Sequence, residues 1–165
     1  MCGKSQVMGD FITYKEDPFP LVRVIVHHKK PTEQDTNEHF ENFKAYLTGG
    51  RPFVILFDVT HAPMVPMAFV HRQAEFMKDM EPFIQTTLVA SAVVSHNVLV
   101  RGLLDILFKI RKPIKPNKVT KKDQKAVDFL YNHYMAFEAG HPQVMHEPDS
   151  EDEDDHTNAV LAPSK

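Results

Sequence analysis

Two continuous apolar runs in the middle of the chain limit its possible folds more than any other feature. They cover residues 52–57 (Pro-Phe-Val-Ile-Leu-Phe) and 88–94 (Leu-Val-Ala-Ser-Ala-Val-Val). Each run has the length of a strand but lacks the alternation of apolar and polar residues found in strands with one solvent-exposed face. A continuous apolar run of this length is typical of strands buried on both faces. Such strands occur in parallel sheets covered by helices. The runs therefore predict an α/β protein, and 165 residues correspond to one domain with room for a tail.

Further strands are expected on either side of these runs. Residues 11–14 (Phe-Ile-Thr-Tyr) alternate, and residues 21–26 (Leu-Val-Arg-Val-Ile-Val) are rich in β-branched side chains. The turn-forming Lys-Glu-Asp-Pro-Phe-Pro between them predicts a hairpin, which we place at an edge of the sheet. Residues 117–120 are expected to form a short additional strand.

The first two helices have recognisable beginnings. Thr32 and Asp35 have the spacing of a capping box, with Asp in place of the usual Glu, at the start of a helix over residues 32–47. Pro66 is suited to begin the helix between the two apolar runs. Pro82 is expected to kink or end that helix, because proline cannot donate the backbone hydrogen bond.

Two more helices complete the pattern. Asn97 is a candidate cap for a helix over residues 98–111, and Thr120 with Asp123 repeats the capping-box spacing before the last helix. The order is strand-strand-helix-strand-helix-strand-helix-strand-helix. The fold class is therefore α/β, with a single, mostly parallel or mixed sheet covered by helices.

Composition divides the chain into a flexible N-terminal arm (residues 1–9), an α/β domain (10–137) and an acidic tail (138–165) that we expect to be disordered. From position 141 onward there are seven acidic residues and one lysine, a net charge of −6. The whole chain carries −3, so the remainder carries +3. A mildly basic domain is followed by an acidic tail.

The cellular setting also follows from composition. The single cysteine, Cys2, permits no internal disulfide, and no apolar run approaches the roughly 18–20 residues of a membrane span. With no signal-peptide pattern, a cytoplasmic location is expected. Ser150, followed by Glu-Asp-Glu, is a candidate site for an acidophilic kinase; the alternative is a plain solubilising tail.

Three passages resemble the STAS superfamily, in particular the small SpoIIAA-like proteins of STAS/SEC14 type. They are residues 53–60 (a strand followed by an acid), 71–78 (a helix) and 91–104. The resemblance extends over about residues 10–135 and implies a binding or regulatory module, not a catalyst. In the SpoIIAA-like antagonists a phosphorylatable serine begins the helix after the central strand. Residues 61–67 (His-Ala-Pro-Met-Val-Pro-Met) contain no serine or threonine, so that phosphoswitch is not carried over.

Polar side chains follow both apolar runs. Ligands of parallel sheets bind outside the carboxyl ends of the strands. The predicted binding rim is formed by the residues after these two strands: Asp58, Thr60, His61, Met64, Ser95, His96 and Arg101. Three interpretations remain open: loop and helix caps, a site for a small ligand or partner, and a weak hydrolase with Ser95, His96 and Asp58 as an acyl-transfer triad. No nucleophile elbow surrounds Ser95, so no catalytic residue is assigned.

The ten histidines do not predict a metal site. His27 and His28 are adjacent and point to opposite faces of a strand, and no predicted helix has the His-x-x-x-His spacing. We expect neither a metal nor another cofactor. The remaining histidines are expected at the surface or in caps.

Basic residues are concentrated between positions 101 and 125, where nine basic residues stand against two acidic ones. The predicted basic patch consists of Lys109, Arg111, Lys112, Lys115, Lys118, Lys121 and Lys122. It could bind an anionic lipid or another polyanion, be screened by the acidic tail, or serve as a solvated connector. No aromatic residues are interleaved for base stacking, which argues against sequence-specific binding of nucleic acid.

The helix over residues 98–111 is apolar over an arc of about 200°, wider than the face that one side of a domain covers. It must be covered by neighbouring elements, a second chain or a ligand. The first functional hypothesis is a non-enzymatic protein-interaction or regulatory module with a protein partner, which could be a homodimer through this helix. The second is a protein that binds a small apolar or phosphorylated ligand (lipid-like or nucleotide), with Arg101 or Lys109 meeting its head group.

Overall fold

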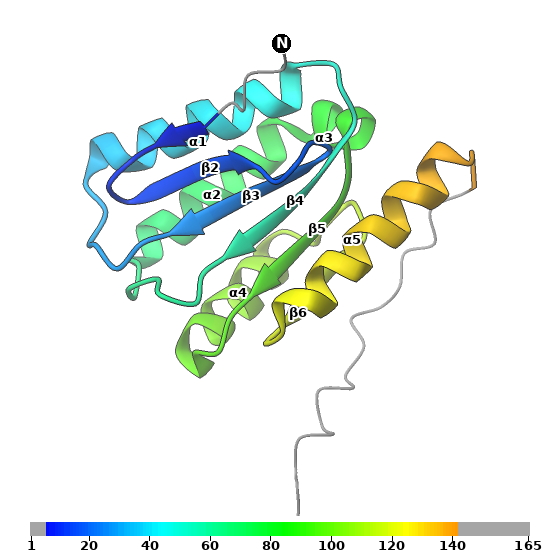
Figure 1. Ribbon diagram of the computed structural model, residues 1–165. Helices are drawn as coiled ribbons and strands as arrows, with labels where there is room; N and C mark the ends of the chain where they lie inside the picture. The colour runs from blue at the N-terminus through cyan, green and yellow to red at the C-terminus, as the bar shows by residue number, and fades with distance from the viewer. Residues whose placement is uncertain (1–5, 142–165) are drawn as a thin grey trace, which may run out of the picture.

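A six-stranded sheet runs through the computed structural model, which describes residues 6–141 (Figure 1). The strands lie side by side in chain order: β1 (Gln6–Met8), β2 (Ile12–Glu16), β3 (Leu21–Val26), β4 (Phe53–Asp58), β5 (Leu88–Val94) and β6 (Asn117–Thr120). The pairs β1–β2 and β2–β3 are antiparallel, and the pairs from β3 to β6 are parallel. The prediction of a single, mostly parallel or mixed sheet is confirmed.

Helices cover both faces of the sheet. Four follow the parallel strands as crossovers: α1 (Glu33–Thr48), α2 (Met67–Asp79), α3 (Glu81–Thr87) and α4 (Val98–Ile110). Parallel crossovers are almost always right-handed, so connections that all advance in the same direction place their helices on the same face. Only α5 (Asp123–Glu138) packs on the other face, where it crosses β4, β5 and β6 (Figure 1).

The continuous apolar runs are explained by these two layers. Phe53 and Ile55 of β4 belong to the core beneath α1, α2 and α3. Val54 and Leu56 belong to the core beneath α5, where they pack with Leu130. All five side chains are fully buried. Because successive side chains of a strand point to opposite faces, a strand covered on both faces needs an apolar residue at every position.

The first helix begins at the predicted cap. The Oγ1 atom of Thr32 accepts a hydrogen bond from the Asp35 backbone N–H at 3.1 Å, and the Asp35 carboxylate accepts one from the Thr32 N–H at 2.8 Å. This reciprocal pair satisfies two backbone donors that a helix start leaves free. The predicted capping box is confirmed.

The helical segment between β4 and β5 is interrupted as predicted. α2 ends at Asp79, Met80 caps both α2 and α3, and Pro82 lies in the first turn of α3. A proline is tolerated there because the N–H groups of a first turn have no partner within the helix.

The flexible N-terminal arm predicted for residues 1–9 is too long, and the prediction of a hairpin at an edge of the sheet is wrong. Residues 6–8 form β1, which pairs with β2 and so puts the β2–β3 hairpin inside the sheet. Three residues are too few for an alternating pattern, so the sequence shows no strand there. The first five residues and the acidic tail from position 142, with Ser150, lie outside the described part of the chain.

The second predicted capping box does not form. Thr120 is the last residue of β6, paired with Val94 of β5, and Lys122 occupies the cap position of α5 without a side-chain hydrogen bond. The Thr120 hydroxyl accepts a hydrogen bond from the Lys122 N–H at 3.2 Å. Strand pairing thus holds Thr120 outside the helix, although its spacing to Asp123 fits a capping box.

Within residues 6–141, no helix has both the length and the apolar character needed to cross a membrane.

The capping box provides a test of the local structure. Replacing Thr32→Ala removes the Oγ1 acceptor of the reciprocal pair but keeps the Thr32 backbone N–H, and should lower the free energy of unfolding by about 1 kcal/mol. Thr48→Ala is the control: the exposed Thr48 hydroxyl only donates back to the Lys44 carbonyl, and its loss should change stability by less than about 0.5 kcal/mol. Urea unfolding measures both. Equal effects of the two substitutions would contradict the capping role.

Candidate functional site

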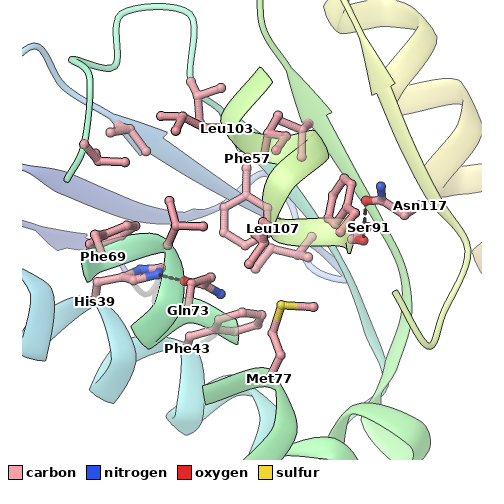
Figure 2. Close-up of a pocket in the computed structure, with 18 of the residues that line it drawn as sticks. His39, Phe43, Phe57, Phe69, Gln73, Met77, Ser91, Leu103, Leu107 and Asn117 are labelled. Carbon is pink, nitrogen blue, oxygen red and sulfur yellow. Dashed lines mark hydrogen bonds between the residues drawn. The ribbon is translucent and has the colours of Figure 1, made fainter. Parts of the chain in front are cut away.

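An apolar cavity lies between the sheet and the helices on the α1 side, with a volume of about 190 Å³ (Figure 2). Phe57 of β4, Phe43 of α1 and Met77 of α2 form parts of its wall. Leu103 and Leu107 of α4 line it from the other side. The cavity therefore lies between the sheet and the four helices on this face, since Ile84 of α3 also lines it, and it is partly open to solvent.

α4 forms the least buried wall. Of its thirteen residues, all in the described part, Val100 alone is buried. Leu103, Leu104, Leu107 and Phe108 are half-buried and line the cavity. The wide apolar arc of this helix thus has a partial explanation: one side of it faces the cavity.

The opposite wall contains a buried histidine. His39 of α1 is 4% exposed, and the ring centroids of Phe40, Phe43 and Phe69 lie 5.0, 6.2 and 6.0 Å from its own. Its Nδ1 atom is 2.8 Å from the Tyr14 hydroxyl. Burial lowers the pKa of His39 from 6.5 to about 4, so the ring is neutral at pH 7.

Gln73 of α2 completes this polar group. Its Oε1 atom is 3.1 Å from Nε2 of His39 (Figure 2). A neutral ring that accepts from the Tyr14 hydroxyl at Nδ1 carries its proton on Nε2, which donates to Gln73. The Gln73 amide nitrogen then remains on the side away from His39, as Figure 2 shows.

A second polar group lies on the sheet wall. Ser91 of β5 and Asn117 of β6 are paired in register, and the Ser91 hydroxyl donates to Asn117 Oδ1 at 2.9 Å (Figure 2). Lys115, two residues before Asn117, also lines the cavity, and burial lowers its pKa. These residues were not predicted as a site. Ser91, a lone polar residue inside an apolar run, was the one signal for them.

Two expectations about individual residues are corrected here. His39 is neither at the surface nor in a cap, because it shares the buried face of α1 with Phe43. The cation in the cavity wall is Lys115, whereas neither Arg101 nor Lys109, which were expected to meet a head group, lines the cavity.

The structure brings the predicted rim residues to one edge of the sheet, since Asp58 and Val94 are paired in register at the ends of β4 and β5. The side-chain hydrogen bonds of Asp58 and Ser95 stay within their own loops. The Asp58 carboxylate accepts from the Thr60 N–H at 3.1 Å, and the Ser95 hydroxyl bonds to the backbone of Asn97. Asn97 in turn caps α4 by accepting from the Leu99 N–H at 2.9 Å.

The predicted rim residues also differ in their exposure to solvent. Ser95 is 0% exposed, so its hydroxyl is not accessible to a substrate, while His61, His96 and Met64 are exposed. Arg101 is half-buried on α4. This arrangement fits the loop and helix caps that the sequence allowed, and it does not assemble a triad.

The predicted basic patch is divided. Lys121 and Lys122 are exposed beyond the carboxyl end of β6, whereas Lys109 and Lys112 are exposed at the C-terminal end of α4. Arg111 forms an ion pair with Glu81 of α3. Lys118 lies 5.8 Å from the centre of the Phe129 ring of α5. The basic residues therefore lie at both ends of β6 and on its α5 side.

The described residues contain no cluster of three or more His, Cys, Asp or Glu side chains that could hold a metal ion.

Comparisons with known proteins place the fold. No protein-family model and no curated protein matches the chain. Among solved structures, it is similar to the crystal structure of an uncharacterized protein of the DUF3478 family, with a SpoIIAA-like fold, from Shewanella loihica PV-4. The TM-score is 0.51 at 13% identity, over 78% of this chain and 92% of that one. The chain thus has a SpoIIAA-like fold, as its resemblance to the STAS superfamily predicts, and the function must be argued from the site.

The buried histidine makes stability depend on pH. The unfolded chain binds a proton at His39 below about pH 6.5, but the folded chain does so only near pH 4. The stabilising contribution of the neutral ring is therefore complete above pH 6.5 and is lost as the pH falls, by about 3 kcal/mol at pH 4. Urea unfolding at several pH values should show this loss in the wild type and not in His39→Gln.

His71→Gln is the matched control, because His71 is exposed on α2. It should keep the pH dependence of the wild type. A wild-type profile in His39→Gln would show that the loss at low pH comes from other groups.

Proposed function

We propose that the domain is a non-enzymatic binding module whose ligand is a small apolar molecule held in the cavity between α4 and the sheet. The observation that supports this proposal is the apolar cavity itself. An engineered apolar cavity of about 150 Å³ in another protein binds benzene, and the cavity here measures about 190 Å³. Its lining is largely aliphatic and aromatic, which is typical of sites for small ligands.

The energetics of packing support an occupant. Residual cavities in protein cores cost about 24 cal/mol per Å³. A sealed cavity of about 190 Å³ would cost about 5 kcal/mol on this scale, a large share of the 5–15 kcal/mol by which domains are stable; this value is an upper limit, because the cavity is partly open to solvent. A ligand that fills the cavity offsets this cost.

The low burial of α4 supports this helix as the place where the ligand enters the cavity. It buries a single side chain, and Val98 and Leu99 at its N-terminal end are 79% and 63% exposed. Segments with few buried apolar contacts open at the lowest free energy. We therefore propose that α4 moves away from the sheet to admit the ligand.

A substitution that fills the cavity tests this proposal. Leu103→Trp should occupy the cavity from α4 and abolish binding of 1-octanol, whereas Leu99→Trp, at an exposed position of the same helix, should leave it unchanged. In the wild type, 1-octanol at 100 times its Kd should stabilise the fold by about 2.7 kcal/mol, a rise in Tm of several degrees. A wild-type response in Leu103→Trp, or no response in the wild type, would overturn the proposal.

A protein-interaction and regulatory role of STAS-like type is the second candidate, supported by the exposed apolar side chains of α4 that adjoin the cavity-lining Leu103. Leu99, Ile106 and Ile110 are 63%, 39% and 45% exposed. With the half-buried Leu103 they are spaced by four, three and four residues, the spacing of a coiled-coil seam. This seam supports pairing with the same helix of a second copy, as the sequence allowed.

Light scattering after size exclusion tests this pairing. If the seam pairs, the chain should elute at twice its 18.9 kDa, and Ile106→Glu should give the monomer, because a buried unpaired charge is costly. Met135→Glu, at an exposed position of α5, should leave the dimer intact. A wild type that stays monomeric at 100 µM, or a dimer that survives Ile106→Glu, would refute the pairing.

A further inference from the structure

The polar groups that line the cavity define the chemistry of the ligand more closely than the volume of the cavity does. In the lining, as far as the structure describes the chain, five polar residues occur among the apolar ones: His39, Gln73, Ser91, Lys115 and Asn117. Lys115 is the cation of this set, and the set contains no carboxylate. An anionic ligand would therefore meet an opposite charge and no like charge in the wall.

Hydrogen bonds within the wall engage the oxygen atoms of both its amide side chains. The Ser91 hydroxyl donates to Asn117 Oδ1, and the His39 ring lies at hydrogen-bond distance from Gln73 Oε1. Each amide is thereby oriented with its oxygen engaged in the wall, which leaves the N–H groups of Asn117 and Gln73 for a ligand. Both polar groups of the cavity offer donors, and a ligand must supply acceptors.

The two polar groups lie on opposite walls. His39 and Gln73 come from α1 and α2, while Ser91 and Asn117 come from β5 and β6, and Phe57 and Leu107 lie between the two pairs in Figure 2. A fitting ligand therefore has an apolar body, with its strongest acceptor at the β6 wall, where Lys115 adds positive charge to the Asn117 amide.

We propose, on the basis of the function proposed above, that the ligand is an apolar monocarboxylate whose carboxylate binds at Lys115 and Asn117 and whose hydrocarbon body lies between α4 and the sheet. A carboxylate loses its hydration on entry, and this loss is tolerated only where charge-assisted hydrogen bonds replace it. Lys115 and the Asn117 amide provide such bonds. The cavity volume fits a body of the size of one aromatic ring or a short alkyl chain.

Octanoate and 1-octanol are suitable probes, because they share an alkyl chain and differ in the charge of the head group. By isothermal titration calorimetry on the full chain, octanoate should bind about ten times more tightly than 1-octanol, the difference expected for a charge-assisted hydrogen bond. Lys115→Met should remove this preference while leaving the affinity for 1-octanol within about twofold, since methionine keeps the apolar stem.

Two further variants make the test specific. Lys112→Met is the matched control: Lys112 is exposed, lies three residues before Lys115 and is not in the cavity lining, so both affinities should stay at the wild-type values. Asn117→Asp keeps an oxygen that accepts from the Ser91 hydroxyl but replaces the amide donor by a negative charge. It should weaken octanoate by at least about tenfold and leave 1-octanol unchanged.

The outcomes separate this inference from the proposed function. If neither probe binds the wild type, both are overturned. If both probes bind equally and Lys115→Met changes neither, the apolar cavity site stands and the carboxylate specificity is wrong. If octanoate still binds Leu103→Trp with wild-type affinity, it binds outside the cavity, and the inference is overturned. Loss of binding of both probes in Leu103→Trp, together with the selective loss in Lys115→Met, supports both.

Discussion

The parallel pairing of β4 with β5 at the centre of the sheet is the constraint on which the other elements depend. Each strand has helices on both faces, so each position must suit one of two different cores. The crossovers between parallel strands place α1 to α4 on one face. The other face is covered by α5, which packs across β4, β5 and β6. The face on which α1 to α4 lie therefore follows from the direction and order of the strands.

The cavity results from one row of residues across this sheet. Ile55, Ser91 and Asn117 are paired in register on β4, β5 and β6. Along this row a large aliphatic side chain is followed by a small hydroxyl and an amide, which bond to each other rather than to α4. The helix above the row therefore meets little apolar surface. Ser91, a small polar residue in a strand core, thus contributes space to the sheet wall of the cavity and, with Asn117, its polarity.

Much of the fold could be predicted from the sequence, because the relevant signals are local. Apolar runs identified β4 and β5, Thr32 with Asp35 marked the start of α1, and Pro82 marked the break between α2 and α3. The errors come from effects that local patterns do not contain. β1 is too short to show a period, and Thr120 has the spacing of a cap but is held in a strand by its pairing with β5.

The site was less predictable than the fold. The rule that polar residues gather at the carboxyl ends of parallel strands placed Asp58 and Ser95 at one edge, but both side chains bond within their own loops. The cavity depends on which side chains meet across α1, α2, α4 and β6. Such contacts between distant segments produce no characteristic spacing of residues in the sequence. His39 illustrates this difference: whether it is a surface ring or part of a cavity wall depends on Tyr14 and Gln73, which are 25 and 34 positions away.

The edge formed by β6 has a consequence for behaviour at high concentration. An edge strand exposes unpaired backbone groups that can join two sheets into a continuous one, and native proteins obstruct this with short, lysine-bearing edges. β6 has four residues, one of which is Lys118, and Lys121 and Lys122 follow it directly. Two molecules that approached through this edge would bring these cations together. The lysines therefore act as a barrier to aggregation, whatever else they bind.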